Sequence, residues 1–149
     1  MKIHLRQIPA DGLHLEGEED CPIQELESEG IVCKGPLRYA LDVGVSEGAL
    51  WANGTLAQPV ELRCVACLES FVHTIEVPAF AVHTELGGPE LIDFAPMVRE
   101  DLLLNLPPYP RCDQHGGRTC AAGDLQRALG AEGPELRKPD WSALDDLKL

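Results

Sequence analysis

Basic residues are scarce in this sequence. Twelve lysines and arginines stand against 25 aspartates and glutamates, so the chain of 149 residues has a formal net charge of −13 at pH 7. Because affinity for a phosphate backbone comes from lysine and arginine, this composition disfavours a large nucleic-acid-binding surface. A negative surface instead attracts and steers basic molecules. We therefore expect a basic protein partner, and direct RNA binding only through a local cationic patch.

Long apolar runs are also missing. No segment approaches the roughly 20 consecutive apolar residues that a membrane-spanning helix needs. The first residues, Met1–Arg6, carry charge without an apolar segment behind them, which predicts that there is no signal peptide. We therefore expect a cytoplasmic protein with no membrane association. In that reducing compartment, cysteines are metal ligands more often than they are disulfide partners.

Motifs of the common enzyme classes are absent as well. The sequence has no glycine-rich phosphate loop, no nucleophile elbow and no His-Glu-x-x-His helix. His4, His14, His73 and His83 are scattered among predicted strands, and we interpret them as surface or hydrogen-bonded side chains. Carboxylates are too numerous for any pair of them to indicate a catalytic site. The sequence therefore favours a non-enzymatic protein.

The first 85 residues are predicted to be mainly β-strands. Leu37–Val45 alternates apolar and polar residues over nine positions, as a half-buried strand does. Short turns such as Ser46–Gly48 imply antiparallel pairing of successive strands. Pro78 removes one donor from a sheet, which predicts an edge strand or a bulge there. The expected strands are Lys2–Ile8, Ile31–Cys33, Leu37–Val45, Ala49–Leu56, Val60–Cys64, Phe71–Val77 and Phe80–Thr84, with a short helix at Pro22–Glu27.

A helix is predicted after the strands, over residues 93–106. Asp93 suits its N-cap, and three prolines after Leu106 end it and lead the chain to Cys112. A short C-terminal helix is expected at 140–148. The fold class is thus α+β: a single domain over 1–149 with an antiparallel, partly barrel-like sheet, a central helix and a C-terminal helix. The apolar residues at helical spacing in the central helix are Phe94, Met97, Val98 and Leu102, and Leu103, Leu104 and Leu106 widen that face.

An acidic segment lies at residues 16–29. It carries seven acids and no base, whereas residues 111–149 are nearly balanced. One interpretation is a solvated face that maintains solubility. The other is a docking surface for a cationic protein. The sequence alone leaves both open, and we favour the first.

Four cysteines in two pairs are the most informative feature of the chain. Cys64 and Cys67 have the two-residue gap common among zinc ligands, and Cys112 and Cys120 follow far downstream with seven residues between them. Thiolates are ligands that zinc prefers, and four of them complete a tetrahedral, structural site. We therefore predict a structural zinc ion held by Cys64, Cys67, Cys112 and Cys120, joining two distant parts of the chain.

Other interpretations of the cysteines remain open. His115 lies within the second pair and can replace a ligand, although we favour an exposed loop histidine. A thioredoxin-like dithiol requires a helix after Cys67, where the sequence favours a strand instead. The four cysteines can also be reduced and without a ligand role. We expect Cys33 to be a small buried apolar residue and Cys21 to have no partner, so neither belongs to the predicted site.

Arginines accompany the predicted ligands. Arg63, Arg111 and Arg118 each lie within two residues of one of these cysteines. Four thiolates on a divalent ion leave a net charge of about −2, which nearby arginines can compensate. Alternatively, the three arginines form a local patch that contacts phosphate. We favour charge compensation.

The order of these segments resembles the large ribosomal RNA subunit accumulation protein family, also called the YceD family. The resemblance covers residues from about 30 onwards and lies in three segments. A strand ends in the cysteine pair of Leu62–Phe71, an Ile-Asp motif opens the helix of Ile92–Pro107, and a proline precedes the leucine-rich Lys138–Leu147. The seven-residue gap between Cys112 and Cys120 departs from the commoner compact arrangement.

The resemblance implies a role in accumulation or processing of large-subunit ribosomal RNA. Together with the charge, it predicts a non-enzymatic factor in ribosome biogenesis that binds a basic ribosomal protein or a precursor of the large subunit. The alternative is a thiol-based or metal-dependent enzyme that acts on RNA or protein. The partner and the step of ribosome maturation are not indicated by the residues.

Overall fold

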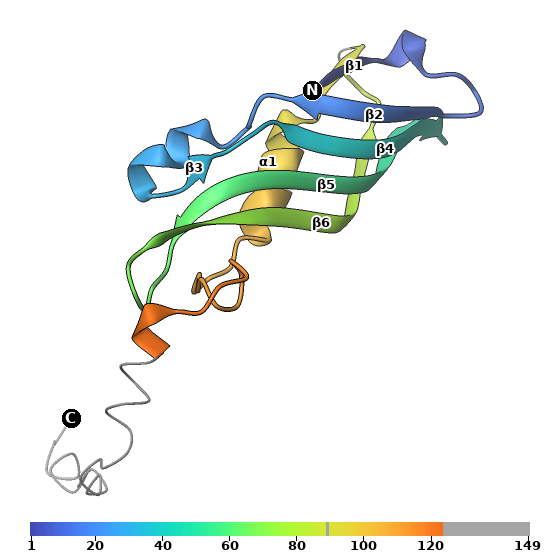
Figure 1. Ribbon diagram of the computed structural model, residues 1–149. Coiled ribbons are helices and arrows are strands. Elements are labelled where there is room, and N and C mark those ends of the chain that lie inside the picture. The colour runs from blue at the N-terminus through green and yellow to red at the C-terminus, as the bar shows by residue number, and fades with distance from the viewer. Residues whose placement is uncertain (89, 124–149) are drawn as a thin grey trace, which may run out of the picture.

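Four long strands and one α-helix dominate the computed structural model, which describes residues 1–88 and 90–123 (Figure 1). Its α-helix α1 covers one face of an antiparallel sheet (Figure 1). The elements, in chain order, are β1 (Lys2–His4), the 3₁₀ helix η1 (Leu5–Gln7), β2 (Leu13–Glu19), the 3₁₀ helix η2 (Gln24–Glu29), β3 (Val32–Cys33), β4 (Leu37–Ser46), β5 (Ala49–Arg63), β6 (Ser70–Glu85), β7 (Leu91–Asp93) and α1 (Ala95–Leu104).

Strand β5 is the centre of the sheet. It pairs with β4 and, further along the same side, with the short strand β3, while β6 pairs with its other side. Strand β2 extends the sheet beyond β4, and β1 and β7 form a separate antiparallel pair. The predicted α+β class and antiparallel pairing are confirmed. The described strands form an open sheet, so barrel-like closure is not confirmed.

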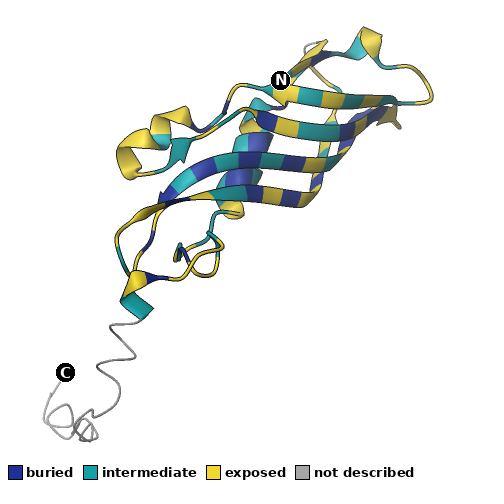
Figure 2. Ribbon diagram, in the orientation of Figure 1, coloured by how far each residue is buried: buried dark blue, intermediate teal, exposed yellow. Residues whose placement is uncertain are grey.

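The core lies between the sheet and α1. Buried and exposed residues alternate along the long strands, as Figure 2 shows, because successive side chains point to opposite faces. The predicted apolar face of the helix supplies Phe94, Val98 and Leu102, each at most 1% exposed. Leu104 is 74% exposed, so the prediction that it belongs to this face is wrong.

The helix is shorter than predicted, and its N-cap is Phe94 rather than the predicted Asp93. A carboxylate oxygen of Asp93 accepts a hydrogen bond of 3.0 Å from the N–H of Ala95, the first helical residue. This bond satisfies one of the free N–H groups at a helix start. At the other end, the N–H of Asn105 still bonds Asp101 O, and the prolines after Leu106 prevent continuation.

Two strands are longer than predicted. The expected break before Val60 is wrong, because β5 continues through Pro59, whose carbonyl accepts a hydrogen bond of 3.0 Å from the N–H of Lys34. At Pro78, β6 also continues, with a register shift against Gly54 and Leu56. Pro78 therefore lies at a bulge on a strand that pairs on one side only, and both parts of that prediction are confirmed.

Differences elsewhere are local. The predicted first strand ends at His4 and continues as η1, and the predicted helix at Pro22–Glu27 is the 3₁₀ helix η2. Strand β2 is not among the predicted strands, because its glutamates obscure the alternation of Leu13, Leu15 and Gly17. The predicted helix at 140–148 lies outside the described residues. Among the described residues, no helix has the length and apolar character needed to cross a membrane.

Cys21 and Cys33 form a disulfide, with their Cα atoms 6.3 Å apart. The expectation that Cys21 has no partner and that Cys33 is merely a buried apolar residue is therefore wrong. The contact depends on η2, which reverses the chain between the two cysteines, and on the pairing of β3 with β5. Neither is visible in the spacing of the cysteines.

Candidate metal centre

The first cysteine pair lies in the turn between β5 and β6. Cys64 follows the last residue of β5, and its N–H bonds Glu69 O at 2.9 Å, which closes the turn. The N–H of Leu68 bonds Cys64 O at 2.9 Å within the same turn. The N–H of Val65 bonds Pro110 O at 2.9 Å and so attaches the turn to the loop that follows α1.

The second pair lies in that loop, which folds back on itself. Cys112 O accepts hydrogen bonds from the N–H groups of Gly116 at 3.1 Å and Arg118 at 3.3 Å. The N–H of His115 bonds Arg111 O at 2.8 Å. These bonds reverse the chain after Cys112, so that Cys120 returns to the β5–β6 turn despite the seven-residue gap.

The structure brings all four predicted cysteines together. Their four Sγ atoms all lie within 4.8 Å of one another. The Sγ atoms of Cys64 and Cys120 are 3.9 Å apart, and those of Cys67 and Cys112 are 3.7 Å apart. A disulfide needs a separation of about 2.05 Å. In a tetrahedron with zinc–sulfur bonds of about 2.3 Å, adjacent sulfurs are about 3.8 Å apart. The cluster thus has the size of a site that can hold a metal ion.

Burial distinguishes the four thiols. Cys64, Cys112 and Cys120 are at most 2% exposed, and only Cys67 is half-buried. An ion at the centre would therefore be surrounded by sulfur and largely shielded from water. With four protein ligands, a tetrahedral ion has no free position for a catalytic water.

The thiols of Cys64 and Cys112 differ in acidity. The N–H groups of Cys67 and Cys112 bond the Cys64 sulfur and lower its pKa to about 6. Burial raises the pKa of Cys112 to about 12, although the nearby Arg118 opposes this. Without a metal ion the cluster therefore keeps protons at neutral pH. Binding of a divalent cation would release them, because thiolates are the ligands.

The predicted arginines occupy three different environments. Arg111 forms a two-pronged ion pair with Asp113, at 3.0 and 2.9 Å, and this contact lowers the pKa of Asp113. Arg118 pairs with Glu69 at 3.1 Å, and its proximity to the Cys112 side chain raises the pKa of Arg118. Arg63 is exposed at the end of β5. Arg111 and Arg118 therefore each pair with a carboxylate beside the cysteine cluster.

His115 supports the loop and lies outside the thiol cluster. Its Nδ1 lies 3.1 Å from the N–H of Arg111, and its ring packs edge-on against His73 at 5.5 Å between centroids. It is half-buried, so the expectation of an exposed loop histidine is wrong in that respect. The group of mutually close ligand atoms consists of the four cysteine sulfurs without His115.

Leu68 has a left-handed backbone, with φ +62°, and its side chain is 67% exposed. This conformation costs a residue other than glycine about 1–2 kcal/mol. We expect Leu68→Gly to raise the free energy of unfolding by up to about 1 kcal/mol, since glycine loses part of that gain to its greater freedom when unfolded. Leu68→Val should lower it, because a β-branched residue fits positive φ poorly.

Urea unfolding of both Leu68 variants tests this expectation. Val65→Gly is the matched control, because Val65 is also exposed in this turn but has no positive φ. It should lower the free energy of unfolding by about 1 kcal/mol. Equal losses in Val65→Gly and Leu68→Gly would contradict the argument.

Two residues of the centre are not predicted from the sequence. Gly116 lies so close to Phe71 and Cys112 that it has no room for a side chain. Glu69 pairs with Arg118 across the two halves of the site. The adjacent glycines of the second cysteine loop are the signal that could have identified Gly116. Comparison of the chain with protein-family models, curated proteins and solved structures gives no match.

Proposed function

We propose that Cys64, Cys67, Cys112 and Cys120 hold a structural zinc ion. The donor set supports zinc, because four thiolates suit a borderline-soft ion and exclude magnesium and calcium, which prefer oxygen. The sulfur separations of 3.7 and 3.9 Å match the edge of a zinc–sulfur tetrahedron. The ion would fasten the loop after α1 to the turn of the β5–β6 hairpin.

We further propose that the protein is a non-enzymatic binding factor in the cytoplasm. The four-thiol cluster carries this proposal, because a site filled by four protein ligands supports structure and leaves no place for a catalytic water. A partner would then bind to the protein surface, which is predominantly acidic because the net charge is −13. Exposed acids of segment 16–29, among them Glu16, Glu27 and Glu29, offer a site for a cationic protein.

The proposed partner is a basic ribosomal protein or a precursor of the large subunit. The family resemblance supports the ribosomal assignment, and the charge supports the basic partner. Direct RNA binding has less support, because Asp113 and Glu69 already pair with Arg111 and Arg118. Those two arginines therefore have little free charge for phosphate.

Affinity purification at two salt concentrations tests this function. At about 50 mM salt the protein should retain basic ribosomal proteins, and at about 500 mM it should release them, because exposed charges are screened. The variant Glu16→Gln, Glu27→Gln, Glu29→Gln should retain markedly less. A control with the same change of net charge, Glu47→Gln, Glu76→Gln, Glu85→Gln, replaces exposed acids outside the segment and should bind as the parent does.

Two outcomes would reject the proposal. Equal losses in both triple variants would show attraction by net charge alone, without a docking surface. Turnover of RNA or protein that is lost in a folded Cys64→Ser, Cys67→Ser variant would establish the enzymatic alternative.

A further inference from the structure

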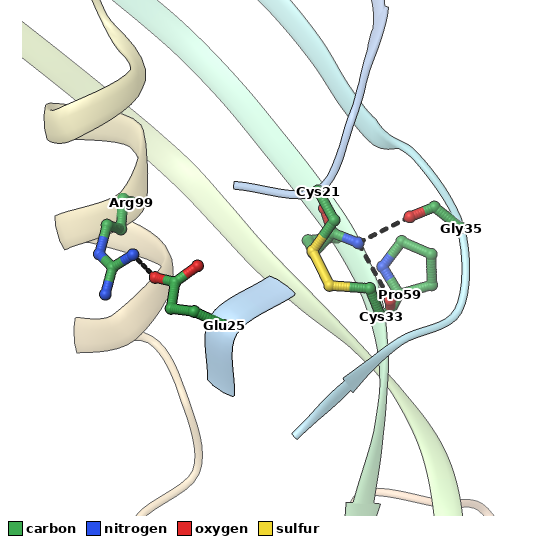
Figure 3. Close-up of a disulfide and its surroundings, with 7 residues drawn as sticks. Cys21, Glu25, Cys33, Gly35, Pro59 and Arg99 are labelled. Carbon is green, nitrogen blue, oxygen red and sulfur yellow. Dashed lines mark hydrogen bonds and ion pairs between the residues drawn. A yellow bond between two sulfur atoms is a disulfide. The ribbon is translucent and has the colours of Figure 1, made fainter. Parts of the chain in front are cut away.

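The Cys21–Cys33 disulfide closes a loop around the acidic 3₁₀ helix η2. Cys21 follows β2 and Cys33 ends β3, so the bond spans 12 positions of the chain (Figure 3). The enclosed segment, 22–32, contains three of the seven acids of segment 16–29. The disulfide therefore determines how part of the acidic surface is held against the sheet.

Apart from the disulfide, segment 22–32 is held mainly by apolar packing, with Leu26 and Ile31 against the core. Ile23 is fully buried, and Glu25 pairs with Arg99 of α1 (Figure 3). The two residues of β3 provide the only ladder pairing of this region with β5. Immediately beyond Cys33 the chain is fixed again, because buried Gln58 donates a hydrogen bond of 2.9 Å from Nε2 to Gly35 O. We therefore expect that opening the disulfide loosens segment 22–32 and leaves β4 in place.

Cys21 of the disulfide lines an acidic cavity. Cys21 lines a cavity of about 580 Å³ together with Glu18, Glu19 and Asp20. Met1 also lines it, and its amino group pairs with Glu19 at 2.7 Å, so the four charged groups sum to about −2. A small thiol that approaches Cys21 through this cavity enters a negative field, which attracts cations and repels anions.

We propose that Cys21–Cys33 is a reducible latch on the acidic surface and that its cavity selects cationic thiols. The thiolate of such a molecule attacks the Cys21 sulfur, the bond to Cys33 breaks, and the electron pair leaves on the Cys33 thiolate. A second thiol attacks the mixed disulfide and releases the Cys21 thiolate. The protein disulfide gains two electrons, and two thiols are oxidised to one small disulfide.

Reduction rates with three small thiols test the latch. The probes are cysteamine, 2-mercaptoethanol and 2-mercaptoethanesulfonate, which carry a positive, a neutral and a negative group. Alkylation and peptide mass spectrometry would follow Cys21 and Cys33 separately from the other four cysteines. Rates are expressed per thiolate and divided by the rates for protein unfolded in urea, where the cavity does not exist.

At low salt, the normalised reduction rate with cysteamine should exceed the rate with 2-mercaptoethanesulfonate by at least about fivefold. The ratio of the two rates should approach 1 at about 1 M salt. The variant Glu18→Gln, Glu19→Gln, Asp20→Asn should lose most of the preference. Asp11→Asn, Glu47→Gln, Glu85→Gln changes the net charge equally with exposed acids that do not line the cavity, and it should keep the preference. A ratio of 1 in the parent, or equal losses in both variants, would overturn the proposal.

Hydrogen exchange tests the structural half of the proposal. Reduction should speed exchange in segment 22–32 by at least about tenfold and leave β4 and β5 unchanged. Unchanged exchange in segment 22–32 would show that the bond does not hold it. Metal content is measured on the same samples, so a failure of the latch is distinguishable from a failure of the proposed zinc site.

Discussion

Removing zinc from the purified protein should lower its melting temperature strongly and disorder the β5–β6 turn and the loop after α1. The binding energy of a structural four-ligand zinc site is on the order of 10 kcal/mol in zinc-finger peptides. This is comparable to the whole stability of a typical domain, about 5–15 kcal/mol. The loss therefore has the largest expected effect of any single change considered for this protein.

The physical reason is that only hydrogen bonds, one ion pair and side-chain packing otherwise join the second cysteine loop to the β5–β6 hairpin. The described links from this loop to the hairpin are the bond from Val65 N–H to Pro110 O, the contacts of Arg118 with Glu69 and Ser70, and those of His115 with His73. Without an ion, Cys64 faces Cys120 at 3.9 Å and Cys67 faces Cys112 at 3.7 Å, which is about the van der Waals distance of sulfur. The metal would replace these weak contacts by four bonds that connect both halves.

The measurement combines metal analysis with thermal unfolding. Protein purified under reducing conditions should contain one zinc per chain, and a strong chelator should remove the zinc and the stability together. Cys112→Ser should lose the metal, because serine is a poor ligand for zinc. The control Cys21→Ser, Cys33→Ser removes two cysteines outside the cluster and should keep one zinc. A metal-free parent protein with an unchanged melting temperature would contradict the prediction.

The sequence predicts the centre well because its signals are local. The short gap between Cys64 and Cys67 requires a tight turn, and the apolar spacing of α1 with the prolines after it leads the chain to Cys112. Alternation in Leu37–Val45 likewise predicts β4 to within one residue. Each of these features depends on neighbours within a few positions, which the sequence displays directly.

The contacts that the sequence does not reveal depend on register and on long-range folding. The Cys21–Cys33 bond requires β3 to pair with Val60 and Glu61 of β5. The contact of Gly116 with Phe71 requires the second cysteine loop to fold onto the first inward residue of β6. Such contacts join residues that are distant in the chain. The sequence pattern is compatible with several strand pairings and does not show which of them forms.

Gly116→Ala should weaken zinc binding by at least about 100-fold, which corresponds to about 3 kcal/mol. A Cβ at this position would lie 2.7 Å from a ring carbon of Phe71 and 2.9 Å from Cys112 O. Phe71 is buried near the start of β6, beside the β5–β6 turn, so its ring has little room to move. Cys112 O is fixed as the acceptor of two backbone hydrogen bonds, and moving it shifts the Cys112 ligand itself.

A matched substitution separates this local effect from a general loss of stability. Gly123→Ala, three residues after Cys120, places its Cβ with no atom of the described residues within 4 Å and has no positive φ, so zinc affinity should remain unchanged. Competition with a chromophoric chelator measures the affinity, and circular dichroism should show that the sheet persists in both variants. Equal affinity in Gly116→Ala and the parent would mean that the second cysteine loop is loose enough to admit a methyl group. The close fit of that loop against Phe71 would then not be what positions Cys112.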